Sequence, residues 1–186
     1  MLSAIILAAG ESKRFGSPKQ LYKINGKTLV ETAIDTLAQA QINQIIVVLG
    51  AHRELIEPIL PKNIIIAINE HYLNGQTSSI QCGIKKLAAG VDAFFVVPVD
   101  LGLIKPQTIA ALTAQFKQAK PLIAIPTYNS RKGHPPVYAA KLIPDILALN
   151  YNEPLYTINR KFEKETLLVE IDDANILKNI NMPHDT

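Results

Sequence analysis

The sequence lacks the features that mark secreted and membrane proteins. Its 186 residues include a single cysteine, Cys82, which excludes an internal disulfide and suits the reducing cytosol. The N-terminus is apolar, but no basic residues precede a long apolar stretch, so we expect no secretory leader. No apolar run reaches the length of a membrane span. We therefore predict a cytoplasmic protein with no membrane partner.

The sequence has no long run of basic residues and no closely spaced histidines. The formal net charge is +3, and the cations near the N-terminus form no long basic run. These cations are Lys13, Arg14, Lys19, Lys23 and Lys27. The histidines His52, His71, His134 and His184 are far apart and lack metal-ligand spacing. The pattern indicates a local anion site and argues against a nucleic-acid partner.

What the sequence does have is a regular alternation of short apolar runs and helix-like segments. The apolar share of 48% is enough for a sizeable core, and the length fits one domain over residues 1–186. Runs rich in Ile and Val, typical of buried strands, are Ala4–Leu7, Gln44–Leu49, Ile64–Ile68, Ala93–Val99, Leu122–Pro126 and Leu167–Ile171. The helix-like segments are Leu29–Ala40, Glu54–Leu60, Ser78–Ala88 and Pro106–Ala119. The alternation predicts an α/β fold with a parallel, helix-flanked sheet.

Two connections have their own signatures. Asn25-Gly26 is typical of a tight turn. Tyr128 to Gly133 is polar and precedes Pro135-Pro136, so we interpret it as a loop that is either mobile or faces the substrate. Ligands of open α/β sheets lie beyond the carboxyl ends of the strands, which is where we expect the site.

The most informative segment runs from Leu7 to Leu21 and follows the first apolar run directly. Ala8, Ala9 and Gly10 carry almost no side chain, so a flat base could lie against their backbone. Arg14 and Lys19 then offer positive charge. Exposed N–H groups with nearby cations form an anion site, which predicts that this loop binds a polyphosphate.

Two commoner phosphate loops do not fit the sequence. Gly10 and Gly16 stand too far apart for a Walker A motif, and Ser17-Pro18 follows instead of Lys and Ser/Thr. Gly26-Lys27-Thr28 mimics the end of a Walker A motif, but Leu21 stands at the position of its first glycine. Since no Gly-x-Gly-x-x-Gly follows the first strand, a dinucleotide fingerprint is absent too.

The string Leu-Ala-Ala-Gly-Glu-Ser-Lys-Arg-Phe-Gly-Ser-Pro-Lys resembles the N-terminal signature of the MobA/MocA-like nucleotidyltransferases. The resemblance implies a three-layer α/β/α, Rossmann-like nucleotidyltransferase fold with a mostly parallel sheet. It further implies that Leu7, Ala8, Ala9 and Gly10 contact the base and ribose of a nucleotide. By the same resemblance, Arg14 and Lys19 hold its phosphates and are catalytic residues that neutralise the leaving pyrophosphate.

Asp100 directly follows the apolar run that ends in Pro98-Val99. An isolated aspartate there is usually a turn or helix-cap residue, but Pro-Val-Asp resembles the metal-binding motif of the family. The resemblance makes Asp100 a catalytic, nucleotide-binding and metal-binding candidate. The family often has a proline where this chain has Gly102, which changes the stiffness of the loop more than ligation.

The segment Gly75 to Ile80 precedes a predicted helix. Ser78 or Ser79 could cap that helix. Resemblance to the Gly-x-x-x-Ser segment of the family also gives Gly75 and Ser79 a contact with the base. Both roles can coexist.

Two later segments resemble the MocA-like branch. Gly133-His134-Pro135 is similar to a Gly-His-Pro segment on the side where the second substrate enters, which makes His134 an acceptor-side candidate. The tail, residues 179–185, is similar to the closing motif of the family, in which an aspartate shares the metal. Here Asn179 takes that place, so the ion should be held less tightly. Asn150 to Leu155 stands where MocA-like chains usually have a Gly-Asp-x-Gly segment, so the resemblance does not fix the identity of the acceptor.

The resemblance implies a Mg²⁺-dependent nucleotidyltransferase, with Mn²⁺ as an alternative ion. The Leu-Ala-Ala-Gly string favours transfer of CMP from CTP to the terminal phosphate of the molybdopterin (molybdenum) cofactor, as in molybdenum cofactor cytidylyltransferases, with release of pyrophosphate. A molybdenum hydroxylase or its maturation factor would be the downstream partner. Alternatives are guanylyl transfer to the same cofactor, transfer to a sugar or polyol phosphate, and a carrier of nucleotide or cofactor without turnover.

Overall fold

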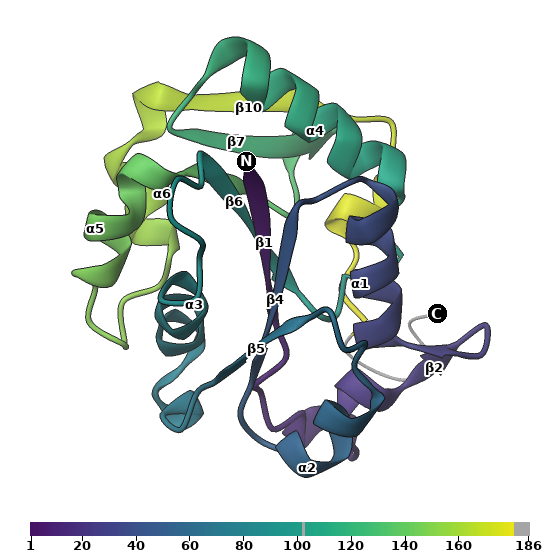
Figure 1. Cartoon of the computed structure of the whole chain (residues 1–186). Coiled ribbons are helices and arrows are strands. Elements are labelled where there is room, and N and C mark those ends of the chain that lie inside the picture. The colour runs from purple at the N-terminus through teal and green to yellow at the C-terminus, as the bar shows by residue number, and fades with distance from the viewer. Residues whose placement is uncertain (102, 181–186) are drawn as a thin grey trace.

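The computed structural model describes residues 1–101 and 103–180, and the chain forms a sheet covered on both faces by helices (Figure 1). Parallel pairing joins β6 (Ala93–Pro98), β1 (Leu2–Leu7), β4 (Gln44–Leu49) and β5 (Ile65–Ile68) in that order. On the other side of β6 the order continues through β9 (Val137–Ala139), β7 (Ile123–Tyr128) and β10 (Thr166–Glu170). The expected three-layer fold with a mostly parallel sheet is confirmed.

Both faces of the central strands are apolar, which is why the sequence shows apolar runs without polar alternation. Alternate residues of β1, β4 and β6 pack on opposite sides: Ile6, Val47 and Phe95 on one, Ile5, Val48 and Phe94 on the other. Such strands can be stable only between two helical layers.

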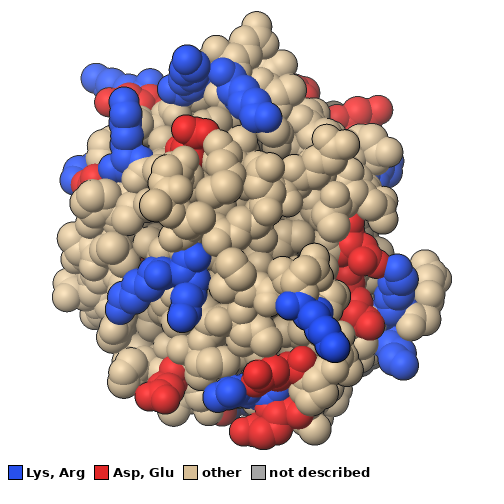
Figure 2. All heavy atoms as spheres, viewed as in Figure 1, with Lys and Arg blue, Asp and Glu red and all other residues tan. Residues whose placement is uncertain are grey.

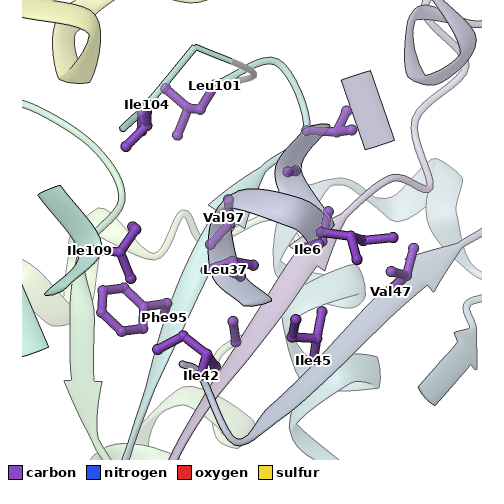
Figure 3. Close-up of a cluster of buried hydrophobic side chains, with 14 of the residues drawn as sticks. Ile6, Leu37, Ile42, Ile45, Val47, Phe95, Val97, Leu101, Ile104 and Ile109 are labelled. Carbon is purple, nitrogen blue, oxygen red and sulfur yellow. The ribbon is translucent and has the colours of Figure 1, made fainter. Parts of the chain in front are cut away.

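One helical layer is formed by α1 (Leu29–Gln39) and α4 (Pro106–Ala119). Figure 3 shows Leu37 and Ile109 from these helices meeting Phe95 and Val97 of β6. The other layer contains α3 (Gln76–Ile84), α5 (Ile143–Leu147) and α6 (Tyr156–Lys161), whose buried residues join the cluster on the opposite face. Figure 1 shows α1 and α3 on opposite sides of β1.

The expected parallel strands and long helices are found with ends shifted by a few residues, and one helix is broken. The predicted helix Glu54–Leu60 is a short α2 (Arg53–Ile56) followed by the 3₁₀ turn Glu57–Ile59. Pro58 lies in that turn, and a proline has no N–H to continue α-helical bonding.

Two antiparallel strand pairs form tight hairpins. Asn25 and Gly26 join β2 (Lys23–Ile24) to β3 (Lys27–Thr28) with φ values of 52° and 83°, so the predicted turn is confirmed. The interpretation of Tyr128 to Gly133 as a loop is wrong for half of its length, because Tyr128 ends β7. Arg131–Lys132 forms β8, which pairs antiparallel with the end of β7 through a turn at Asn129 and Ser130.

The strand β9 is the largest departure from the expected topology. It pairs antiparallel with both β6 and β7 and separates two parallel groups of strands. Its short length and the preceding Pro135-Pro136 hide it in the sequence. β9 is entered through the His134–Pro135 peptide bond, which is cis.

Candidate active site

The carboxyl ends of β1 and β6 lead into one cavity of about 330 Å³. The loop after β1 contributes Leu7, Ala9 and Gly10, and the end of β6 leads to Asp100. Gly75 and Ser79 come from the start of α3. Seven of the predicted residues, Leu7, Ala9, Gly10, Lys19, Gly75, Ser79 and Asp100, therefore line the same hollow.

Lys19 and Asp100 form an ion pair inside this cavity. The Lys19 Nζ atom lies 2.8 Å from Asp100 Oδ2, and the two side chains are only 16% and 20% exposed. This contact links the loop after β1 to the end of β6, across 81 residues of sequence. The hollow thus combines a cation with a carboxylate, the pair of charges that an Mg-bound polyphosphate would engage.

Two of the predicted nucleotide-binding residues lie outside the lining. Ala8 is fully buried, and its N–H donates to the Val48 carbonyl, so it belongs to the core beneath the loop. Arg14 lies on the 3₁₀ turn Lys13–Phe15 and is exposed. Their proposed contacts with the nucleotide stay predictions.

The prediction that Ser78 or Ser79 caps α3 is wrong. The N-cap is Gly75, with φ 101° and no side-chain hydrogen bond, and the helix begins two residues before Ser78. Ser78 Oγ instead donates to the Gly75 carbonyl at 2.8 Å and accepts from Asn69 Nδ2 at 2.9 Å. Asn69 Nδ2 also donates to Ser79 Oγ at 3.0 Å, which fixes this hydroxyl at the edge of the cavity.

The proposed metal-binding residues Asp100 and Asn179 are close in the fold, but no hydrogen bond between their side chains is seen in the described residues. The Ile180 N–H donates to the Asp100 carbonyl at 3.1 Å, so the residue after Asn179 is anchored beside Asp100, and Asn179 itself is exposed. Residues 181–185 of the tail motif and Gly102 lie outside the described part of the chain. Within the described part, no cluster of three or more His, Cys, Asp or Glu side chains is arranged for a metal. A single carboxylate suits Mg²⁺ that takes its other ligands from phosphate and water.

A second hollow of about 330 Å³ adjoins the first, because Gln76 and Pro98 line both. His134 lines this hollow together with Lys132 and Tyr156. Partial desolvation lowers the pKa of His134, although the residue stays exposed at the rim of the hollow and the Asp100 carboxylate acts in the opposite direction. A lowered pKa favours the neutral imidazole at pH 7, which acts as a hydrogen-bonding partner.

The sequence did not reveal two parts of the site. Gln20 is 2% exposed and reaches back under the loop to the Ala8 carbonyl. Gly50 follows β4, and a Cβ atom there would lie 2.8 Å from Tyr72 Cβ and 2.9 Å from the Ala9 carbonyl oxygen. The only signal for Gly50 in the sequence was its position directly after the predicted strand Gln44–Leu49.

The surface gives no sign of an extended binding tract on the face shown in Figure 2, where basic and acidic side chains are interspersed over a mostly neutral surface. Across the helices of the described residues, none is both long and apolar enough to cross a membrane.

Comparison with known proteins shows the family to which the chain belongs. The family model described as the MobA-like NTP transferase domain matches residues 4–166. The chain belongs to this family. Membership makes it a nucleotidyltransferase and confirms the resemblance of the first loop to MobA/MocA-like proteins.

Individual relatives agree with this membership. A protein of Geobacillus sp. (strain WCH70), named probable molybdenum cofactor guanylyltransferase, is 31% identical over 67% of this chain and 69% of its own length. The bifunctional protein GlmU of Exiguobacterium sp. is 34% identical over 63% of this chain, but over only 27% of its own length. The crystal structure of Rv0371c from Mycobacterium tuberculosis H37Rv superposes with a TM-score of 0.88 at 18% identity, covering 99% and 94% of the two chains. That likeness shows the shared fold.

Proposed function

We propose that this nucleotidyltransferase transfers a nucleoside monophosphate to the terminal phosphate of the molybdenum cofactor, with CTP as the donor. The observation that carries the proposal is that one cavity unites the loop after β1, Lys19 and Asp100, and adjoins a second hollow with His134. The name of the Geobacillus relative supports the cofactor as acceptor. Leu-Ala-Ala-Gly supports cytidine, whereas the relative's name supports GTP as the alternative donor.

In the proposed reaction, the two adjoining hollows bring the nucleotide and the acceptor phosphate together. An oxygen of the acceptor phosphate, lying in the hollow with His134, attacks the α-phosphorus of the nucleotide. A new P–O–P linkage forms, the bond to the β-phosphate breaks, and pyrophosphate leaves with the bonding electrons. Catalysis of this kind is chiefly positioning and neutralisation of charge.

The residues of the chain divide this work. Lys19 neutralises the leaving pyrophosphate, and Asp100, with Asn179, would hold a Mg²⁺ ion, which supplies further charge neutralisation at the phosphates. Because Lys19 and Asp100 are paired with each other, phosphate and metal would each take one partner of the ion pair. The second pKa of a phosphate monoester is about 6, so the acceptor is mostly ionised at pH 7 and needs no general base.

The donor is tested by pyrophosphate release with CTP, GTP, ATP and UTP, each with MgCl₂ and molybdopterin cofactor. We expect CTP to give the fastest turnover and the Asp100→Ala variant to give none. Turnover dominated by GTP would replace cytidine with guanosine. Binding of a nucleotide without turnover under any of these conditions would favour a carrier.

A sugar or polyol phosphate is the second candidate acceptor. Pro154 and Leu155, from the segment that departs from the MocA-like pattern, line the second hollow, which supports an acceptor other than the molybdenum cofactor. Product analysis after incubation with the cofactor and with a panel of sugar phosphates separates the two. Exclusive use of a sugar phosphate would overturn the molybdenum cofactor assignment and with it a molybdenum hydroxylase as downstream partner.

A further inference from the structure

The side chain of Gln20 holds two carbonyl groups of the loop after β1. Its Nε2 atom donates to the Ala8 carbonyl at 2.9 Å and to the Gly10 carbonyl at 2.8 Å. Gln20 is only 2% exposed, so both amide protons are used away from bulk water. A buried side-chain amide with two such bonds fixes the backbone that it contacts.

The two other carbonyls of this stretch are held from the segment after β4. The Ala51 N–H donates to the Ala9 carbonyl at 3.0 Å. The His52 Nε2 atom lies 3.2 Å from the Glu11 carbonyl, which can only accept, so this nitrogen carries the proton. All carbonyls of residues 8–11 therefore have donors in the protein.

Holding the carbonyls also sets the direction of the amides. In a trans peptide the N–H points opposite to the C=O of the same peptide unit. Fixing the Ala8 and Gly10 carbonyls toward Gln20 therefore turns the N–H groups of Ala9 and Glu11 away from it. Within residues 1–101 and 103–180, the N–H groups of residues 9–12 donate to no protein acceptor, and Ala9 and Gly10 line the nucleotide cavity.

The same amide is connected to the cation of the site. Gln20 Oε1 accepts from Ser12 Oγ at 3.3 Å, and Ser12 Oγ accepts from the Lys19 N–H at 3.1 Å. Lys19 in turn reaches Asp100. Gln20 thus joins the free amides of the loop and the lysine in one hydrogen-bonded unit.

We propose that Gln20, assisted by His52, is a positioning residue for nucleotide binding. Gln20 itself lines the cavity, but both protons of its amide are used by the Ala8 and Gly10 carbonyls. It therefore acts by aiming backbone N–H donors and Lys19 at the phosphates. The inference rests on the proposed function, because it assumes that a nucleoside triphosphate occupies this cavity. It assigns to Gln20 a role that the comparisons do not give it.

The test compares Gln20→Met with Gln81→Met. Gln81 offers a matched control, since it is 6% exposed and its Nε2 atom donates at 2.9 Å to the carbonyls of Ile146 and Leu149. Both variants exchange a buried amide that bridges backbone carbonyls for an apolar side chain of similar size. Gln81 does not line the nucleotide cavity.

Affinity is measured by calorimetry with MgCl₂ and whichever of ATP, GTP, CTP and UTP the wild-type chain binds best, and stability by thermal unfolding. We expect both variants to lose similar stability, while Gln20→Met binds at least about tenfold more weakly and Gln81→Met stays within about twofold of wild type. Unchanged affinity in Gln20→Met, or equal weakening in both variants, overturns the positioning role. Failure of wild type to bind any of the nucleotides overturns the proposed function and this role together.

His52→Asn keeps the test decisive if Gln20→Met does not fold. His52 has φ 59°, a conformation that asparagine tolerates, and its side chain lies outside the nucleotide cavity. The shorter side chain releases the Glu11 carbonyl alone, so we expect about threefold weaker nucleotide binding. Wild-type affinity in a folded His52→Asn chain would overturn the proposal.

Discussion

At the scale of residues, the ion pair of Lys19 and Asp100 is where the charges of the site meet. Each side chain is mostly screened from water, and each comes from a different motif of the sequence. The sequence predicted Lys19 as a cation of the loop after the first strand and Asp100 as a carboxylate at a strand end, and in both cases the resemblance to the family's motifs gave the residue its role. It did not predict that they contact one another, since contact depends on the path of the loop between Gly10 and Lys19.

Replacing Lys19 should weaken nucleotide binding without unfolding the chain. Loss of one charge-assisted phosphate contact should cost about 1.5–3 kcal/mol of binding free energy. Lys23→Ala removes an exposed lysine from the nearby hairpin and serves as the control. We expect Arg14→Ala to have a smaller effect than Lys19→Ala, because Arg14 lies outside the cavity lining. Calorimetry with Mg-nucleotide measures all three, and wild-type affinity in Lys19→Ala would contradict the role of Lys19.

Two glycines near the loop should respond oppositely to the same substitution. Among the residues that the structure describes, none has a heavy atom within 4 Å of a Cβ atom built at Gly10, and Gly10 lines the cavity. Gly10→Ala should therefore keep its stability while its methyl group takes up ligand space. Gly50→Ala must displace Tyr72 or the Ala9 carbonyl, which should cost about 1–3 kcal/mol of stability. Thermal unfolding and nucleotide titration of both variants check this contrast, and the reverse order of stabilities would contradict it.

At the scale of elements, the sequence predicted best what is buried and repetitive. The parallel strands and α1, α3 and α4 were visible because apolar residues recur in them over several positions. β8 and β9 were missed because they have two and three residues, too few for a periodic pattern. Gln20 was missed for a related reason, because a side chain that bonds to backbone carbonyls leaves no residue pattern.

The start of α1 gives a prediction on pH. Thr28 and Glu31 form a capping box in which each side chain bonds to the backbone N–H of the other residue. The Thr28 hydroxyl, and then the Thr28 N–H, lower the pKa of Glu31 in the folded chain. A lowered folded pKa stabilises the fold above the unfolded value of about 4.3, and this contribution is lost as the pH falls through the folded pKa.

Thr28→Ala should therefore destabilise the chain by about 1 kcal/mol at pH 7 and by less at pH 3. Urea unfolding of wild type, Thr28→Ala and Glu31→Gln at both pH values measures the difference. A destabilisation by Thr28→Ala that is the same at both pH values would contradict the contribution of the ionised Glu31.

At the scale of the whole molecule, the fold class was predictable, while the order of strands was not. Alternating apolar runs and helices imply a helix-covered parallel sheet, but they do not say that antiparallel β9 lies between β6 and β7. That insertion places Gly133 and His134 next to the end of β6 and so builds the second hollow. That residues 1–186 form a single domain stays a prediction.

The central claim is that a nucleoside triphosphate lies between the loop after β1 and Asp100. The most direct measurement is a crystal structure of this chain grown with MgCl₂ and the nucleotide that it binds best. We predict phosphates beside Lys19 and the N–H groups of Ala9 and Gly10, with the metal ion on Asp100. A nucleotide bound elsewhere, with the cavity of Lys19 and Asp100 free of ligand, would contradict the account.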